Sequence, residues 1–204
     1  MIQAIPSWYR PYLHLAVPSF FGLGIMAVSL MFLSDLVAWE LLVIPLTYIF
    51  SNLVEWFTHR NMMHRRTPQA AILYDRHVPQ HHRVYVTEDM AMREPIEFRL
   101  VLIPAYGILL IFLATLPLTT AFYFLIGKNV AALFVFTTMG YVVGYEWLHL
   151  SYHLPATHPV SKNGLIKKLR THHAVHHDPR LMQQWNLNVT VPLWDWILGT
   201  NYKK

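Results

Sequence analysis

The sequence predicts an all-α integral membrane protein with about four transmembrane helices and a histidine-rich helical cap. Three observations lead to this fold class. Of the 204 residues, 54% are hydrophobic and only 13% are charged, whereas an ordinary soluble domain is about one quarter charged. Apolar stretches recur that reach the roughly 20 residues needed to cross a bilayer as a helix. Histidines gather in the polar stretches that follow two of these apolar stretches.

Four membrane spans are expected within a single membrane domain of residues 1–204, at about 13–33, 37–57, 100–126 and 130–153. The first is longer than the apolar core of a signal peptide and lacks a convincing small-residue cleavage site, so we expect a retained helix. The third is long for one straight helix, and a kink or break is expected near Pro117. Residues 58–99 and 154–204 then form the cap.

Basic residues lie outside the apolar stretches and indicate the orientation of the chain. Arginines follow the second span, and a run of lysines and arginines follows the fourth. The turns within each apolar hairpin are short and nearly uncharged. By the positive-inside rule, a multi-pass protein with both termini and the cap in the cytoplasm is expected. A membrane also explains the net charge of +5 better than a nucleic-acid partner does.

The chain contains 13 histidines and no cysteine, so any metal must be held by His, Asp or Glu. Ten of the histidines fall into four clusters near the ends of the second and fourth spans. The clusters are His59 and His64 (HX4H), His77, His81 and His82 (HX3HH), His149 and His153 (HX3H), and His173, His176 and His177 (HX2HH). Paired spacings of this kind, repeated four times, predict a metal site in the cap.

The spacings indicate how the imidazoles are shared. Residues four apart on a helix project from one face and can bind one metal, which suits His149 and His153. A spacing of five places His59 and His64 about 140° apart on a regular helix. Either the helix ends or distorts there, or each ring serves a different metal. Adjacent histidines diverge, and ten imidazoles exceed the capacity of one ion, so a di-metal centre of iron, zinc or copper is expected.

Three histidines stand outside these pairs or compete with them. His14 and His158 belong to no paired spacing and are not expected to bind metal. His172 adjoins the last cluster, and an HX3HH reading that begins at His172 competes with the one that begins at His173.

Three segments resemble the fatty acid hydroxylase and sterol desaturase superfamily, whose members carry four such histidine boxes around a di-metal centre. They are residues 145–153 (YEWLHLSYH), 171–177 (THHAVHH) and 192–200 (PLWDWILGT), the last of which looks like the WD and GT tail of that superfamily. The resemblance extends over residues 55–200. It implies metal-ligand roles for His59, His64, His77, His81, His82, His149, His153, His173, His176 and His177.

Three carboxylates lie close to these ligands in the sequence. Glu55 and Glu146 stand at helical spacing from His59 and His149, and Asp195 lies in the tail. Such groups could accept hydrogen bonds from the free ring nitrogens of metal ligands. For Glu55 and Glu146, an interfacial ion pair with a nearby arginine is the alternative.

The resemblance implies an oxygen-dependent oxidoreductase that hydroxylates a lipid acyl chain drawn from the bilayer. It would use two iron ions, which zinc could replace in purified protein, together with dioxygen and an external electron donor. Lipid or sterol desaturation and carotenoid hydroxylation are the nearest alternatives. A histidine-rich metal transporter would place its ligands near mid-bilayer, and a bis-histidine haem protein would leave the HH pairs unexplained. Substrate, electron donor and oligomeric state are not determined by the sequence.

Overall fold

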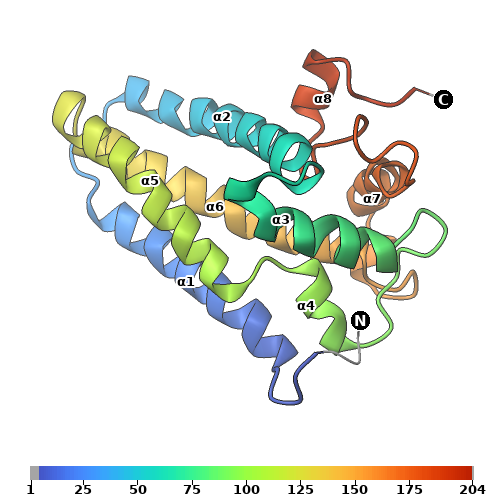
Figure 1. Ribbon diagram of the computed structural model, residues 1–204. Coiled ribbons are helices and arrows are strands. Elements are labelled where there is room, and N and C mark those ends of the chain that lie inside the picture. The colour runs from blue at the N-terminus through green and yellow to red at the C-terminus, as the bar shows by residue number, and fades with distance from the viewer. Residues whose placement is uncertain (1–4, 204) are drawn as a thin grey trace. The chain divides into compact units, whose positions relative to one another are not determined.

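The computed structural model describes residues 5–203, and the regular elements named within that range are helices (Figure 1). The α-helices are α1 (Pro11–Met31), α2 (Val43–Thr58), α3 (Ala71–Arg76), α4 (Phe98–Val101), α5 (Ala105–Leu125), α6 (Lys128–Tyr152), α7 (Gly164–His176) and α8 (Leu193–Ile197). Shorter 3-10 turns are η2 (Ala38–Leu42), η4 (Pro68–Ala70), η6 (Pro95–Glu97) and η7 (Val160–Lys162). Two π-helical turns, η3 (His59–Met63) and η5 (His77–His82), complete the set.

Four helical stretches are long and apolar enough to cross a membrane, which confirms the predicted all-α membrane fold. They are Pro11–Met31, Ala38–Met63, Pro95–Leu125 and Lys128–Tyr152. The most apolar 18-residue window of the last stretch is 67% buried, against 17–28% for the other three. The last stretch is therefore the one enclosed by protein, while the others expose most of their apolar side chains, as helices in contact with lipid do.

The chain forms two compact units. The cap unit comprises Met1–Pro11, Asn52–Leu102 and Trp147–Lys204, and the membrane unit comprises Tyr12–Ser51 and Ile103–Glu146. The membrane unit holds α1, α5 and the N-terminal parts of α2 and α6. The cap unit holds α3, α4, α7, α8 and the C-terminal ends of α2 and α6.

The core of the membrane unit forms around α6. Phe134, Val135 and Met139 are buried there against apolar residues of α1, α2 and α5. Phe21 of α1 packs edge-on against Phe112 of α5, with the ring centroids 6.0 Å apart. Close packing needs small residues at membrane-helix contacts. A Cβ added to Gly22 would clash with Cγ2 of Val143, so glycine permits this close approach of α1 and α6.

The third membrane stretch is broken at Pro104, not at Pro117. Pro117 lies inside the unbroken helix α5, whereas α4 ends at Val101 and α5 begins at Ala105. A residue before proline is driven away from helical geometry, which explains the break. Within the membrane unit, both backbone groups of Ile103 find side-chain partners. Its amide donates to the carboxylate of Glu146 at 3.1 Å, and its carbonyl bonds Nε2 of His14 at 2.8 Å.

The cap unit ends in a C-terminal segment of residues 185–200 that is held by buried polar contacts. Asn186 adopts a left-handed conformation (φ 53°), which asparagine tolerates better than most residues, and its amide donates to the carbonyl of Thr200 at 2.8 Å. Trp56 of α2 donates from Nε1 to Oγ1 of Thr200 at 2.9 Å. The segment is thereby closed on itself and attached to the end of α2.

Candidate metal centre

A π turn builds the first histidine pair. His59 begins η3 and His64 directly follows it. The backbone amide of His64 donates to the carbonyl of His59 at 3.1 Å. A hydrogen bond between residues five apart widens the turn, so side chains at i and i+5 fall on one face. On a regular α-helix the same two side chains would diverge by about 140°. The π turn is therefore the distortion that allows both rings to serve one group.

A second π turn, η5, carries the next cluster. His77 and His82 are five residues apart, and their Nε2 atoms lie 3.0 Å from each other. The ring of His81, which precedes His82, stands at 90° to the ring of its neighbour. The rings of the adjacent residues His81 and His82 therefore face different neighbouring side chains.

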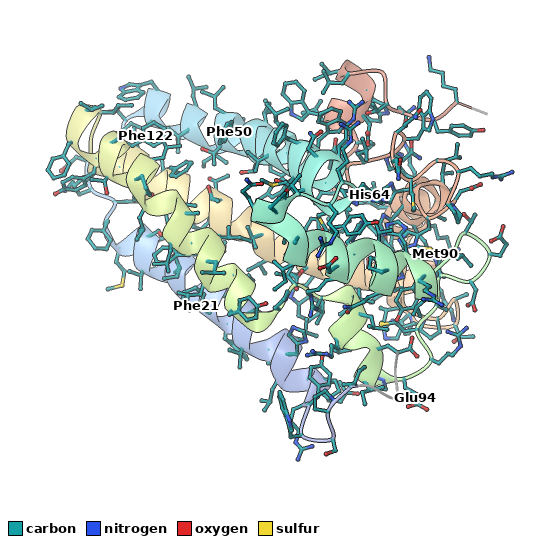
Figure 2. The ribbon with its side chains drawn as sticks, viewed as in Figure 1. Phe21, Phe50, His64, Met90, Glu94 and Phe122 are labelled. Atoms are coloured by element: carbon teal, nitrogen blue, oxygen red, sulfur yellow. The ribbon has the colours of Figure 1, made fainter. Side chains whose placement is uncertain are left out.

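The first histidine group contains His59, His64, His77, His82 and His176. Their ligand nitrogens all lie within 4.8 Å of one another. Nε2 of His59 is 2.8 Å from that of His77, and Nε2 of His64 is 3.0 Å from that of His176. The rings come from η3, from η5 and from the last turn of α7, so three separate elements converge on one point. His64 is labelled in Figure 2.

The second histidine group contains His81, His149, His153 and His173. His177 adjoins it, because its Nε2 lies 3.2 Å from that of His81 and 3.0 Å from that of His173. His149 lies in the last turn of α6 and His153 directly follows that helix, while His173 lies in the last turn of α7 and His177 directly follows it.

Both HH pairs divide between the groups. His82 and His176 belong to the first group, and their neighbours His81 and His177 lie with the second. The rings of His82 and His177 stack with centroids 4.2 Å apart. Nine of the ten clustered histidines thus lie in two adjoining groups, with His177 beside the second, and His173 rather than His172 belongs to the second.

Backbone carbonyls orient the rings from behind. The Nδ1 atoms of five histidines lie within hydrogen-bond distance of a carbonyl: His59 with Leu187 (2.5 Å), His81 with Leu100 (3.1 Å), His153 with Met90 (2.8 Å), His176 with Trp185 (3.1 Å) and His177 with Tyr85 (2.6 Å). A carbonyl can only accept, so the proton must sit on Nδ1. Each Nε2 then presents its lone pair to the interior of the group, as a metal ligand requires.

The nitrogen separations fit a bound metal. Ligand nitrogens about 2.0–2.1 Å from one ion and at right angles to each other lie about 3 Å apart. The Nε2 separations of 2.8–3.3 Å in the first group match this value. In addition, Nε2 of His153 is buried without a hydrogen-bond partner among residues 5–203. Unprotonated nitrogens that are 2.8–3.3 Å apart, as in the first group, repel one another unless a cation lies between them. These histidines could therefore hold metal.

Burial keeps these rings neutral. Loss of solvent lowers the pKa of His64 from 6.5 to about 2 and that of His177 to about 3. Burial and repulsion by neighbouring imidazoles likewise lower the pKa well below its usual value for His77, His81, His82, His153, His173 and His176. Only neutral imidazole binds metal, so burial keeps these rings in the protonation state that metal binding requires.

The three carboxylates singled out in the sequence have hydrogen bonds to the backbone. Glu55 accepts from the amides of Val189 and Thr190. Glu146 binds the amide of Ile103, as described above. Asp195, which is fully buried, accepts from the amides of Leu187 at 2.9 Å and of Asn188 at 2.8 Å. Glu55 and Asp195 therefore hold the backbone of residues 187–190 in place, and the Leu187 carbonyl of this segment orients His59.

The three remaining histidines have other contacts. Nε2 of His172 lies 3.1 Å from Oδ2 of Asp195. His158 is exposed, and its Nδ1 accepts from the amide of Val160 at 3.2 Å. His14 binds the carbonyl of Ile103 within the membrane unit.

Sequence reasoning missed the groups that position the rings. The carbonyls of Tyr85, Met90, Leu100, Trp185 and Leu187 could not be found, because every residue carries a carbonyl and only the fold selects which ones meet a ring. It also missed Glu97, a carboxylate that is 1% exposed within the cap unit. The sequence does contain a weak indication of the role of Glu97 in local structure. A glutamate three residues after Glu94, with Pro95 between them, is typical of a helix start.

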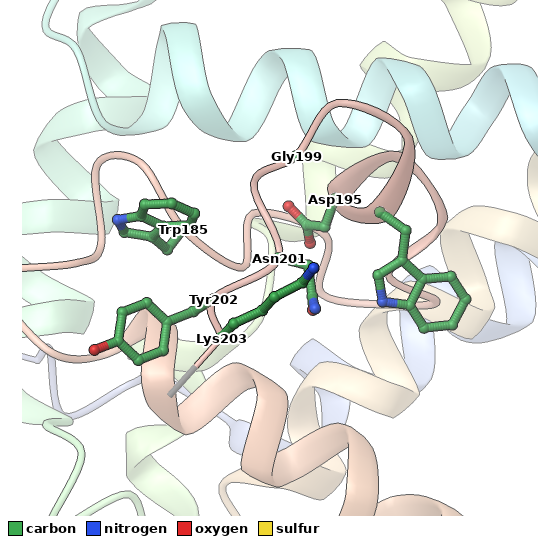
Figure 3. A pocket seen from close by; sticks show the side chains of 7 residues that line it. Trp185, Asp195, Gly199, Asn201, Tyr202 and Lys203 are labelled. Atoms are coloured by element: carbon green, nitrogen blue, oxygen red, sulfur yellow. The ribbon is translucent and has the colours of Figure 1, made fainter.

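A surface pocket is lined by residues between 185 and 203 of the cap unit. It is lined by Trp185, Asp195, Trp196, Gly199, Asn201, Tyr202 and Lys203 (Figure 3). The pocket is formed by the tail that orients His59 and His176.

The fold and the site together define an all-helical membrane protein with a buried histidine centre suited to metal. The family model described as "Fatty acid hydroxylase" matches residues 44–200, most of the chain. The chain therefore belongs to the fatty acid hydroxylase family, whose members are oxygen-dependent oxidoreductases. This confirms the family expected from the histidine motifs.

One solved structure supports the same fold. Full-length Scs7p, with only its hydroxylase domain visible, matches this chain with a TM-score of 0.61 at 19% sequence identity. The match covers 92% of this chain and 66% of that one, just under two thirds of its length. At this identity the likeness shows a shared fold and no more. No curated protein matches the chain.

Proposed function

We propose that this protein is a membrane di-iron oxygenase that hydroxylates a lipid acyl chain. The observation that carries the proposal is the pair of adjoining all-histidine groups, five rings in the first and four with His177 beside them in the second. A family of oxygen-dependent oxidoreductases and four apolar helices supply the context. Each group would hold one iron ion, and zinc could occupy the same nitrogens in overexpressed protein.

The residues of the chain have three tasks in this reaction. A bound iron pair supplies the oxidising power for an unactivated C–H bond when dioxygen and electrons are present. The histidines would hold that pair through Nε2, and backbone carbonyls keep Nδ1 protonated on five of them: His59, His81, His153, His176 and His177. The burial of all ten rings at 5% exposure or less keeps water from the centre. Electrons would come from an external donor.

The proposed topology places the termini and the metal centre on the cytoplasmic side. It rests on the basic residues that follow the second and fourth membrane stretches. Reporter tags at either terminus should respond from the cytoplasm, and tags near Asp35 or Lys128 from the opposite side. A C-terminus on the opposite side from the cytoplasm would overturn this topology.

The test of the proposed function is a product analysis joined to a metal analysis. Cells with the intact gene should contain a lipid that has gained one oxygen atom and that is absent without the gene. Purified protein should contain close to two metal ions per chain. A product that has lost two hydrogen atoms instead would favour desaturation, and active protein with one metal or none would refute the di-metal centre.

A metal transporter is the alternative from another class. It would need ionisable ligands near the middle of the spans. The histidine groups instead draw on His59 near the C-terminal end of the second stretch, on His149 near that of the fourth, and on residues beyond. Metal uptake by proteoliposomes, without lipid oxidation, would support the transporter.

A further inference from the structure

We propose that Glu97 is a positioning residue for the second histidine group. It acts through Tyr85 and through the backbone of residues 85–101, without touching the metal itself. The inference rests on the proposed function, because it assumes that each histidine group holds its own metal ion.

The side chain of Glu97 accepts hydrogen bonds from the loop that precedes it in the chain, residues 85–94. Its side chain is 1% exposed. Oε2 accepts a hydrogen bond from the hydroxyl of Tyr85 at 2.7 Å. Oε1 accepts from the amides of Arg93 at 3.0 Å and of Glu94 at 3.2 Å. A buried carboxylate is costly unless its oxygens are satisfied, and here both oxygens bind one loop, so the loop and the carboxylate hold each other in place.

Tyr85 carries the effect of Glu97 to the histidines. Its side chain is fully buried, and its carbonyl lies 2.6 Å from Nδ1 of His177. The centroid of its ring is 4.6 Å from that of His153 and 5.3 Å from that of His81. The hydrogen bond to Glu97 therefore fixes a residue that contacts three rings in or beside the second group.

The backbone on either side of Glu97 orients further rings of that group. Before it in the chain, the carbonyl of Met90 lies 2.8 Å from Nδ1 of His153. After it, the carbonyl of Leu100 in α4 lies 3.1 Å from Nδ1 of His81, and His149 hydrogen-bonds the backbone of Val101. Residues 85–101 thus supply the partner for four rings.

The first group has a separate support. The carbonyls behind His59 and His176 come from Leu187 and Trp185 of the C-terminal segment. Loss of Glu97 should therefore weaken one metal site and spare the other. Outer partners of metal ligands typically contribute about 10–100-fold to metal affinity, which sets the size of the expected effect.

The test measures the release of zinc to a chelator from purified protein loaded with two zinc ions. In Glu97→Gln and Tyr85→Phe, one of the two ions should leave about 10–100-fold faster than in the unmodified protein, and the other should leave at the original rate. Glu97→Gln should be the milder change, since its amide oxygen can still accept from the two loop amides. Glu88→Ala, an exposed glutamate of the same loop, is the matched control and should change neither rate.

Two further variants assign the affected ion to a group. In a His64→Ala background, where the first site is impaired, Glu97→Gln should accelerate release of the remaining zinc. In a His153→Ala background it should have no such effect. The inference is overturned if Glu97→Gln and Tyr85→Phe release both ions at the original rate, or if the effect appears in the His153→Ala background. If the unmodified protein binds fewer than two zinc ions, the proposed di-metal centre fails instead.

Discussion

The two histidine groups use the same ligand chemistry but are built on different local structure. The first takes two pairs, His59 with His64 and His77 with His82, from π turns in which residues five apart share a face. The second takes His149 from the last turn of α6 and His153 from the position after it, four residues along. A π turn is rare and is frequently found at functional sites. Of the two options for the HX4H pair, the structure has the distorted turn, which brings His59 and His64 into one group.

The groups also differ in what supports them. Rings of the first are oriented by the C-terminal segment, which Asp195 and Glu55 hold through its amides. Rings of the second are oriented by residues 85–101, which Glu97 holds. Two buried carboxylates, far apart in the sequence, therefore perform the same task for different rings. Each difference between the groups can be tested by a variant that affects one group only.

The largest effect is expected from the removal of a ligand. His153→Ala should lose metal from the second group, should lower activity by more than the roughly 100-fold that follows loss of an outer partner, and should lower the melting temperature. His158→Ala is the control, because that side chain is exposed and lies six residues beyond the end of α6 at Tyr152. It should retain both metals and most of its activity. Metal loss from His158→Ala, with retention in His153→Ala, would contradict this assignment.

His81 and His82 are adjacent in the chain but belong to different groups, so variants at these two positions distinguish the groups most clearly. His82→Ala should deplete the first site and His81→Ala the second, although the two residues are neighbours in the chain. Metal analysis of each variant should find about one ion, and activity should fall by more than about 100-fold in both. Double variants would sharpen the result, because His82→Ala should add little to a first site already lost through His64→Ala. If both single variants lose both ions, the groups are one coupled centre.

A smaller effect is expected from Asp195, the support of the first group. Asp195→Asn should release the first metal about 10–100-fold faster, since the amides of Leu187 and Asn188 lose a charged acceptor and His59 loses its fixed carbonyl. The second metal should be unaffected. Zinc release in the same assay as for Glu97 measures both rates, and acceleration of the second ion alone would reverse the assignment of the two carboxylates.

Acid should destabilise the metal-free protein. The pKa values of the buried histidines lie below the value of about 6.5 in an unfolded chain, so the unfolded chain binds more protons as the pH falls through 6.5. Stability is therefore fully present above that pH and decreases below it, by up to about 1.4 kcal/mol per pH unit for each ring that stays neutral. Melting temperatures of the metal-free protein between pH 7.5 and 5 measure this. His173→Ala should reduce the slope, and a melting temperature that rises on acidification would contradict the prediction.

The smallest effect is expected from His172, which stands next to the proposed ligand His173 but contacts Asp195 instead. His172→Gln retains a hydrogen-bond donor for that carboxylate, so both metals should remain and activity should stay within a few-fold of the unmodified protein. Metal analysis and product formation, set beside those of His173→Ala, would test this. A loss of metal equal to that of His173→Ala would show that His172 is the ligand.

The sequence by itself determined the four membrane helices, the family and the histidine clusters. Apolar runs of sufficient length and paired imidazoles are local features, and each can be read without knowledge of the fold. The break at Pro104 instead of Pro117 could not be read in this way. Both prolines interrupt an apolar run, and the difference lies in the partners that Ile103 finds on His14 and Glu146, 89 and 43 residues away.

Only the tertiary structure decided how the histidines are shared and what holds them. The division of His81 from His82 depends on a π turn and on rings that arrive from α6 and α7. The carbonyls of Leu100 and Leu187 orient rings because the chain returns to the histidines at those points, and nothing in a leucine marks it for that task. Contacts between residues distant in the chain are set by packing, and packing is a property of the whole fold.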